Sequence, residues 1–396
     1  MSLFLFRKQP LKTIYVIGVV FYTLASIPVL VIKYALPSQR PRRTWTLKRA
    51  LTVHLVRSAV GKLIYGAAPI LDPPLESYKK DAKRIVSIEP TPDLVVGEIR
   101  ELAEKNGVKP EKLAGFWLGP TGPDGVAGQR ARPEERVVMH LHGGAHIMGG
   151  AHSSSSTGPC YQGYLEHFGP NIRVFVPEYR LASTAPFPAA NPFPASLLDA
   201  IASYRYLVQD VGFEPHQIIL AGDSAGGGIA LNLARYLATA NLPGLPQAGG
   251  LLLLSPTMDW GRTYADDPDS CYSRNAKADF VEGVMESGYT PRALCGPALP
   301  LEFAKTSAWI SPGSRVAEWA PEMFAGLPRT LIVAGAAEQT LDGMRTIRER
   351  LVKAMGEEKV VYIEVPDVPH DLFLMSWCEP ERTETLVRTG EWVRSL

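Results

Sequence analysis

The chain has 396 residues, of which 46% are hydrophobic and 20% are charged. This composition supports a sizeable core and excludes a globally disordered protein, and the formal net charge of +1 provides no overall basic field for binding nucleic acid. Four cysteines, none in a Cys-x-x-Cys pair, exclude a disulfide scaffold and argue against a structural zinc site.

An uncharged apolar segment of 20 residues lies near the N-terminus, at 13–32 (TIYVIGVVFYTLASIPVLVI). A helix of this length spans about 30 Å, the thickness of a bilayer core, so we predict a single transmembrane anchor behind a short tail at 1–12. A signal peptide, whose apolar region is usually shorter, and a core helix, which would show a polar stripe, are the alternatives. Six basic residues follow the segment and three precede it, which favours a cytoplasmic position for the rest of the chain.

A basic stretch at 33–94 follows, which we assign to the juxtamembrane region and to part of a cap. Within it, residues 50–67 have the apolar spacing of an amphipathic helix, with Val53, Val56 and Val60 on one face. Such a helix can lie on the membrane surface beside the anchor or pack on the folded domain. The sequence leaves these two arrangements open.

From residue 95 to 396 the patterns of strands and helices alternate, which indicates one α/β domain. Short apolar runs predict strands at 137–141, 172–176, 218–221, 251–254, 330–334 and 360–365, and helical periodicity predicts helices at 196–208, 225–239, 341–355 and 383–393. This alternation is typical of a parallel sheet covered by helices on both faces. A stretch rich in Trp, Pro and Gly at about 259–327 is predicted to be an insertion between two strands.

A serine motif, Gly-Asp-Ser-Ala-Gly at 222–226, stands between a predicted strand and a predicted helix. A serine on such a sharp turn projects its hydroxyl from the carboxyl edge of the sheet. Gly222 and Gly226 permit strained dihedral angles and a close approach of strand and helix because they lack Cβ. A phosphate loop is the alternative, but it requires a Lys-Ser/Thr pair that the sequence lacks here. We therefore predict that Ser224 is a nucleophile.

A second motif, His-Gly-Gly-Ala at 142–145, directly follows the predicted strand at 137–141. Small residues in this position allow backbone N–H groups to reach a developing oxyanion. We predict an oxyanion hole within Gly143, Gly144 and Ala145, joined by the N–H group of Ala225 at the start of the next helix.

A serine nucleophile requires a base, which in this type of fold follows the last strand. Among the eight histidines, His370 alone lies after the serine motif, so we predict that His370 is the base. The acid that orients it should follow the strand at 330–334, where the sequence offers Glu338 and Asp342. We prefer Glu338, which is closer to the end of the strand, and regard Asp367 as a more remote candidate.

Over residues 95–380 the chain resembles the hormone-sensitive-lipase-like group of α/β-hydrolases. Five segments in the family's order carry the resemblance: HLHGGAH (140–146), PEYRLASTAPFPAA (177–190), GDSAGGGIALNLA (222–234), AGAAEQTLD (334–342) and VPHDLF (368–373). The resemblance implies an eight-stranded sheet, serine esterase chemistry, and a cap built from N-terminal residues and from the insertion at 259–327. It assigns catalytic roles to Ser224 and His370 and implies that 179–182 supports the oxyanion loop.

Two positions depart from the family pattern. Ala145 replaces a third glycine, which implies a narrower pocket, and Glu338 replaces the usual aspartate. The N-terminal anchor is similar to those of arylacetamide deacetylases and fungal steryl acetyl hydrolases, which act on hydrophobic esters at the endoplasmic reticulum with their catalytic domains in the lumen. That precedent opposes the charge count, so the side of the membrane stays open.

We therefore expect a membrane-anchored ester hydrolase that cleaves a small hydrophobic or lipid-like ester through an acyl-enzyme, without a cofactor or a metal. One alternative is a non-catalytic ligand-binding protein on the same scaffold, against which the retention of His370 argues. The other is an amide or secondary-metabolite tailoring hydrolase, which the sequence does not separate from an esterase. The expected partners are the ester and membrane lipid, with no nucleic acid, and the oligomeric state is left open.

Overall fold

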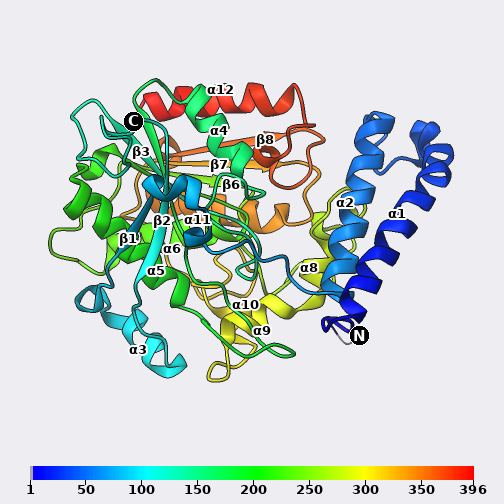
Figure 1. Cartoon of the computed structure of the whole chain (residues 1–396), viewed down its shortest axis with the longest axis horizontal. Coiled ribbons are helices and arrows are strands. Elements are labelled where there is room, and N and C mark those ends of the chain that lie inside the picture. The colour runs from blue at the N-terminus through cyan, green and yellow to red at the C-terminus, as the bar shows by residue number, and fades with distance from the viewer. Residues whose placement is uncertain (1–2) are drawn as a thin grey trace.

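Eight strands form one sheet at the centre of the molecule in the computed structural model, which describes residues 3–396 (Figure 1). The strands are β1 (Ile85–Ile88), β2 (Leu113–Leu118), β3 (Arg136–Leu141), β4 (Ile172–Pro177), β5 (Ile218–Asp223), β6 (Gly250–Leu254), β7 (Thr330–Gly335) and β8 (Val360–Val365). Their order is β1-β2-β4-β3-β5-β6-β7-β8. β2 pairs antiparallel with β1 and β4, and all other neighbours are parallel. The predicted α/β class with a mostly parallel eight-stranded sheet is confirmed.

Helices cover both faces of the sheet because its central strands are apolar on both sides. In β5, Ile218 and Leu220 enter the core on one face, while Ile219 and Ala221 enter the core on the other. The first face is covered by α5 (Ala195–Arg205), α6 (Ala225–Thr239) and α11 (Leu341–Met355), and the second by α4 (Gly158–His167) and α12 (Glu381–Arg394). Each strand therefore alternates between two separate hydrophobic cores.

Six strands lie where the sequence predicted them, and two strands, the edge strand β1 and its neighbour β2, were not predicted from the pattern. β1 lies inside the stretch 33–94, so the sheet begins within the segment that the sequence analysis assigned to the juxtamembrane region and the cap. α3 (Gly97–Asn106) connects β1 to β2. The insertion at 259–327 forms four short helices, α7 (Cys271–Arg274), α8 (Glu282–Ser287), α9 (Tyr289–Cys295) and α10 (Phe303–Thr306).

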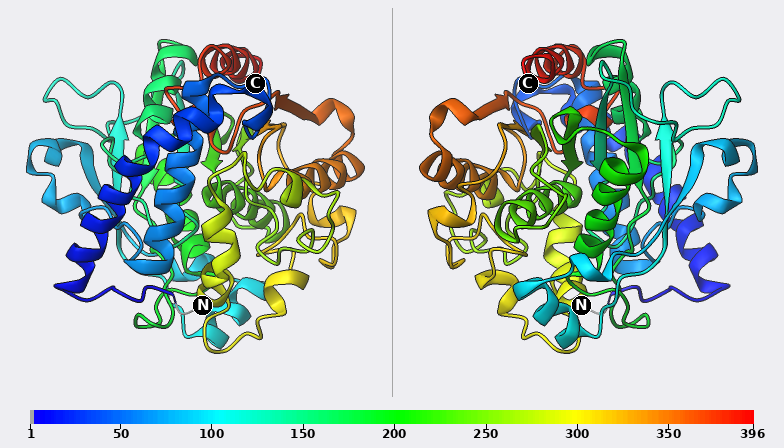
Figure 2. Two further views of the ribbon diagram at one scale, coloured as in Figure 1. Left: turned by 90° about the vertical axis from the view of Figure 1, so that its right-hand side faces the viewer. Right: turned by 90° about the vertical axis from the view of Figure 1, so that its left-hand side faces the viewer.

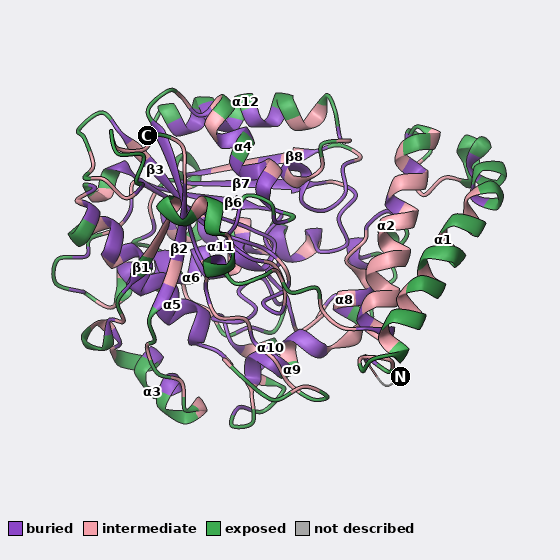
Figure 3. Ribbon diagram, in the orientation of Figure 1, coloured by how far each residue is buried: buried purple, intermediate pink, exposed green. Residues whose placement is uncertain are grey.

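The predicted apolar N-terminal segment is part of α1 (Leu11–Ala35), which extends beyond 13–32 at both ends. The first two residues of the predicted tail lie outside the described residues. Within residues 3–396, α1 is the one helix long and apolar enough to cross a membrane. Most of its residues are exposed, in contrast to the helices on the sheet (Figure 3).

Helix α2 (Leu47–Gly66) lies between α1 and the domain that contains the sheet, and Figure 2 shows α1 and α2 side by side on one flank. α2 packs against α8 with a close backbone approach, since a Cβ atom on Gly283 would lie 2.6 Å from the Cα atom of Gly61. Two ion pairs attach the same helix to the domain: Arg57 pairs with Glu282 of α8, and Arg49 pairs with Glu381 of α12. The amphipathic helix predicted at 50–67 therefore packs on the folded domain, one of the two arrangements that the sequence left open.

We predict opposite effects for alanine at the two glycines of this contact. Gly283→Ala places a methyl group against the backbone of α2, so the melting temperature should fall by several degrees. Gly61→Ala is the matched control, because its Cβ meets no atom within 4 Å and alanine favours a helix over glycine by about 1 kcal/mol. Calorimetry should show a stable or raised melting temperature for Gly61→Ala, and equal losses in both variants would contradict the packing.

Candidate active site

Ser224 stands on a strained turn between β5 and α6, with φ 50° and ψ −117°. A Cβ atom on Gly222 would collide with the carbonyl oxygen of Gly226, and a Cβ atom on Gly226 would collide with the carbonyl oxygen of Leu141. The absence of these two side chains lets α6 start directly at the end of β5. The turn therefore projects the serine hydroxyl from the carboxyl edge of the sheet, as the motif predicted.

A hydrogen-bonded chain runs from Ser224 through His370 to Glu338. The Oγ atom of Ser224 lies 2.8 Å from Nε2 of His370, and Nδ1 of His370 lies 2.7 Å from Oε2 of Glu338. All three side chains are buried, and Glu338 is fully so. The structure thus brings together the three residues that the sequence predicted for nucleophile, base and acid.

The carboxylate of Glu338 is fixed by further donors. Its Oε1 atom accepts hydrogen bonds from the hydroxyl of Ser255 at 2.7 Å and from the N–H group of Gly335 at 2.5 Å. Asp342, the other candidate acid, lies in the first turn of α11 and accepts a hydrogen bond from the N–H group of Tyr272 at 3.2 Å. Asp367 binds the hydroxyl of Thr44 near the surface. Neither of these two carboxylates forms a hydrogen bond with the imidazole.

Gly143 occupies the predicted oxyanion loop, but its N–H group is engaged elsewhere. It donates to Oδ1 of Asp223 at 2.9 Å, and the same oxygen lies 2.7 Å from Nε2 of His140. A donor that already serves a buried carboxylate is not free for an oxyanion. The geometry therefore removes Gly143 from the predicted donor set, and Asp223, the second residue of the serine motif, holds the loop in place.

The other predicted donors remain beside the nucleophile. Gly144 has φ 107° and Ala145 has φ 56°, and both line the same cavity as Ser224 and His370. Ala225 is the first residue of α6, where backbone N–H groups lack partners within the helix. The structure therefore leaves Gly144, Ala145 and Ala225 as the candidate donors to an oxyanion.

Side chains from outside the loop support it. The hydroxyl of Tyr179 donates to the carbonyl oxygen of His142 at 2.7 Å, and the hydroxyl of Thr290 donates to the carbonyl oxygen of Ala145 at 3.0 Å. The first contact agrees with the supporting role that the resemblance implied for 179–182. The second comes from α9 and couples the insertion to the oxyanion loop.

A cavity of about 380 Å³ adjoins Ser224 and His370, a volume that suits a small organic ligand. Its apolar walls come from α2 and the segment after it (Val60, Ile70), from the insertion (Trp260, Phe280, Val281, Val284, Met285) and from the loop after His370 (Leu374, Met375). Within residues 3–396 no three His, Cys, Asp or Glu side chains are grouped to hold a metal ion.

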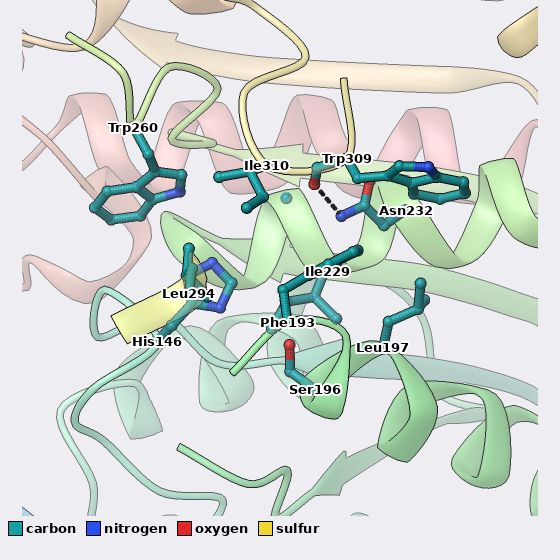
Figure 4. A pocket seen from close by; sticks show the side chains of 11 residues that line it. His146, Phe193, Ser196, Leu197, Ile229, Asn232, Trp260, Leu294, Trp309 and Ile310 are labelled. Carbon is teal, nitrogen blue, oxygen red and sulfur yellow. Dashed lines mark hydrogen bonds between the residues drawn. The ribbon is translucent and has the colours of Figure 1, made fainter. Parts of the chain in front are cut away.

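A much smaller hollow lies next to this cavity, and Trp260 lines both. Its volume is about 10 Å³, about the smallest space that can hold a water molecule. Figure 4 shows His146, Phe193 and Trp309 around it, with the side-chain amide of Asn232 donating to the carbonyl oxygen of Trp309 at 2.7 Å. Trp260 is therefore a side chain that the cavity shares with a space too small for a substrate.

Two carboxylates near His370 were not identified by the sequence analysis. Oδ2 of Asp371 lies 3.3 Å from Nε2 of His370, and its buried Oδ1 atom has no hydrogen-bond partner among the described residues. Oδ1 of Asp279 accepts a hydrogen bond from the backbone N–H group of His370 at 3.2 Å, and Oδ2 accepts one from Gln339 at 2.7 Å. Adjacency to His370 could have indicated Asp371, whereas Asp279 lies in the insertion without any motif.

These carboxylates set the proton affinity of His370. Burial lowers the pKa of His370, but the carboxylates of Asp371, Glu338 and Asp279 outweigh it and raise the pKa to about 10. Burial also raises the pKa of Asp371 well above its ordinary value and the pKa of Asp279 to about 6. His370 and Asp371 therefore titrate as a pair: a proton on the imidazole leaves Asp371 charged, and the same proton on Asp371 leaves the imidazole neutral, the form that a base requires.

We predict that Asp371→Asn lowers the pKa of His370. The variant removes a nearby negative charge that stabilises the imidazolium ion, so the pKa should fall by roughly 1–3. NMR titration of the ring resonances, assigned with His370→Gln, measures the change. Asp342→Asn is the matched control and should leave the pKa in place; a fall as large as that in Asp371→Asn would contradict the assignment.

Comparison with known proteins agrees with this fold and geometry. The matching family model describes the alpha/beta hydrolase fold and covers residues 138–374. The esterase LipI of Mycobacterium tuberculosis is 31% identical over 70% of this chain and 81% of its own length. An acetyl-hydrolase of Streptomyces hygroscopicus is 29% identical over 67% of this chain and 77% of its own length.

Solved structures show the same architecture. A hormone-sensitive lipase from a metagenome library matches with a TM-score of 0.55 and 24% identity over 72% of this chain and 80% of its own. Carboxyl esterase 2 of the fungus Tuber melanosporum matches with a TM-score of 0.57 and 17% identity, over 84% of this chain and 93% of its own. The chain therefore belongs to the hormone-sensitive-lipase-like esterase family of the α/β-hydrolase fold.

Proposed function

We propose that the protein is a serine-type carboxylic ester hydrolase attached to a membrane by its N-terminal helix. The family and its esterase relatives support the reaction class. The observation that carries the assignment is the chain of hydrogen bonds from Glu338 through His370 to the hydroxyl of Ser224, which ends in an apolar cavity. This geometry activates a hydroxyl that would otherwise be a weak nucleophile.

The residues divide the reaction between them. Oγ of Ser224 attacks the ester carbonyl carbon while Nε2 of His370 accepts the hydroxyl proton, and the N–H groups of Gly144, Ala145 and Ala225 bind the oxyanion. His370 then returns the proton to the departing alcohol, which leaves an acyl group on Ser224. Water repeats the sequence with His370 as its base and releases the acid.

The cavity favours a hydrophobic substrate. Its walls are mostly aliphatic and aromatic side chains, so an apolar acyl group or alcohol gains from burial there. Relatives named acetyl-hydrolase support a short acyl group, in line with the deacetylase-like activity that the sequence indicated. We therefore propose a lipid-like or otherwise hydrophobic ester, such as an acetyl ester of an apolar alcohol.

Attachment to a membrane is proposed from α1. Its apolar sequence and exposure support contact with lipid, and the resemblance to deacetylases of the endoplasmic reticulum supports that membrane as its location. A ligand-binding protein without catalysis would not need a base aligned on a serine, so the 2.8 Å contact between His370 and Ser224 favours an enzyme.

We predict that Ser224→Ala reduces kcat for p-nitrophenyl acetate by at least about 10³-fold, because the nucleophile is lost while the oxyanion donors remain. Steady-state hydrolysis by the purified chain measures this. The buried Ser203→Ala, outside the cavity, is the control and should retain activity in the folded protein, because the Ser203 hydroxyl bonds only a carbonyl oxygen of its own helix. Turnover by Ser224→Ala at the wild-type rate would refute Ser224 as the nucleophile, and an inactive wild-type chain would favour the binding protein.

We also predict that Trp260 limits the length of the acyl group. Trp260→Leu should join the cavity to the small hollow behind the indole, raising the ratio of kcat/KM for octanoyl over acetyl p-nitrophenyl esters at least about tenfold. Trp309→Leu is the matched control, because Trp309 lines the hollow without lining the cavity. An unchanged ratio in Trp260→Leu, or an equal rise in Trp309→Leu, would contradict this role.

A further inference from the structure

Helix α1 presents an apolar face outward. Its inner face, against α2, mixes polar residues such as Tyr15 and Thr23 with the buried apolar Leu30, and the Tyr15 hydroxyl donates to the carbonyl oxygen of Lys62 at 3.0 Å. Its outer face is apolar, with Phe21 69% and Ile32 76% exposed. A helix on a water-exposed surface places its polar residues outward. The outer face of α1 is therefore built for an apolar surrounding.

The N-terminal end of α1 is tied to the catalytic domain. The ring of Phe4 is fully buried, with its centroid 5.1 Å from that of Phe187 and 5.0 Å from that of Tyr289. The backbone N–H group of Phe6 donates to the carbonyl oxygen of Gly66 at 2.7 Å. Phe187 lies in the segment after β4 and Tyr289 begins α9, so the chain before α1 packs against the insertion and the segment that follows β4.

The C-terminal end of α1 is tied to the same domain by the segment that follows it. The indole of Trp45 is buried, and its N–H group donates to the carbonyl oxygen of Asp367 at 2.7 Å. The guanidinium of Arg42 donates to the side chain of Asn275 at 2.6 Å and to the carbonyl oxygen of Ala336 at 2.8 Å. Ala336 precedes Glu338 by two residues, so this end is fixed next to the catalytic acid.

From these contacts we propose that α1 lies in one leaflet of a membrane, parallel to its surface, instead of crossing the bilayer. The inference rests on the proposed membrane attachment. A crossing helix would separate its ends by the thickness of a bilayer core, about 30 Å, with the folded domain on one side only. The contacts of Phe4 or those of Trp45 would then have to break, leaving a large aromatic side chain without its buried site. An in-plane helix keeps both ends, and the domain, on one side.

The basic residues around α1 indicate that its outer face contacts lipid. The first 71 residues contain eleven basic residues and no acidic residue, although the whole chain carries a net charge of only +1. Basic side chains beside an apolar helix are attracted to anionic headgroups. Three of the eleven form ion pairs with the folded domain (Arg42, Arg49 and Arg57), and the positive charge of the other eight would repel a second copy of the chain. The outer face of α1 therefore contacts the acyl chains of a membrane leaflet that contains anionic lipids, and the basic residues contact the headgroups.

The same arrangement places the active site close to the membrane. α2 packs along α1 and contributes Val60 to the cavity wall, and Ile70, which follows α2, lines the cavity while 60% exposed. An apolar ester dissolved in the leaflet would therefore reach the cavity along an apolar surface. This route suits the hydrophobic substrate proposed above.

Single cysteines on either side of α1 test the in-plane arrangement. Gln9→Cys and Ser38→Cys place reactive thiols at exposed positions before and after the helix, and Lys112→Cys marks the catalytic domain. The four natural cysteines are buried, which limits background labelling. The reagent is a membrane-impermeant maleimide, added to sealed microsomes from cells that express the full chain, with and without detergent.

We expect all three thiols to share one pattern, labelled either in intact microsomes or only after detergent. Labelling of Gln9→Cys and Ser38→Cys on opposite sides would overturn the in-plane helix and show a crossing one, while leaving the ester hydrolase intact. A chain that does not sediment with microsomes at all would overturn membrane attachment as well.

Vesicle binding tests the outer face itself. The double variant Ile14→Asp/Phe21→Asp should weaken cosedimentation of the full chain with phosphatidylcholine–phosphatidylserine vesicles at least about tenfold. Val126→Asp/Leu301→Asp alters two exposed apolar residues elsewhere and is the matched control. Equal binding by both variants, or a wild-type chain that forms dimers through α1 and ignores vesicles, would overturn the proposal.

Discussion

The close approach of β5 and α6 at Ser224 is the constraint on which the rest of the site depends. Both glycines that flank the turn would collide with backbone carbonyls if they carried a Cβ atom, and a change of rotamer cannot relieve a clash with backbone. The strained φ of 50° at Ser224 is therefore built into the fold. Because β5 lies between β3 and β6, the turn places the hydroxyl at the middle of the carboxyl edge.

Loops from neighbouring strands converge on that hydroxyl. The oxyanion loop follows β3, Glu338 follows β7 and His370 follows β8, so parallel strands deliver each group to the same edge of the sheet. The insertion then closes the site from above through Thr290 and Asp279, which bind the oxyanion loop and the backbone of His370. The site is thus assembled from segments that are distant in sequence but share one sheet edge.

Buried carboxylates surround the imidazole of His370. Burying a charged carboxylate destabilises the fold unless hydrogen-bond donors replace its lost hydration. Glu338 accepts hydrogen bonds from a hydroxyl and a backbone N–H group, and Asp279 accepts them from three backbone N–H groups, including that of Phe280. Such donors offset the loss of hydration. Asp371 has fewer partners, so its charge depends most on the protonation of His370.

The sequence predicted most of the site because its key residues follow apolar strands that have clear patterns. Ser224, His370 and Glu338 each come soon after a predicted strand, and the parallel topology brings those strand ends together. β1 was missed because it is a short edge strand, and β2, which lies between β1 and β4, because its burial does not follow a simple alternation. Gly143 was misassigned because only the structure shows that its N–H group serves Asp223.

The N-terminal region shows a different limit. The apolar length of α1 was visible in the sequence, but length alone does not distinguish a helix that crosses a bilayer from one that lies in it. That distinction depends on Phe4 and Trp45, two aromatic residues whose partners lie more than a hundred residues away. No local pattern encodes such contacts, so only the folded structure reveals that both ends meet one domain.

The most direct test of the central claim is covalent labelling with a fluorophosphonate, followed by peptide mapping. Serine hydrolases react with this reagent at the activated hydroxyl. We expect one phosphonylated residue, Ser224, with modification abolished in His370→Gln although that variant stays folded. A native chain that remains unlabelled, or is labelled at another residue, would contradict the account of Ser224 as a hydroxyl activated by His370.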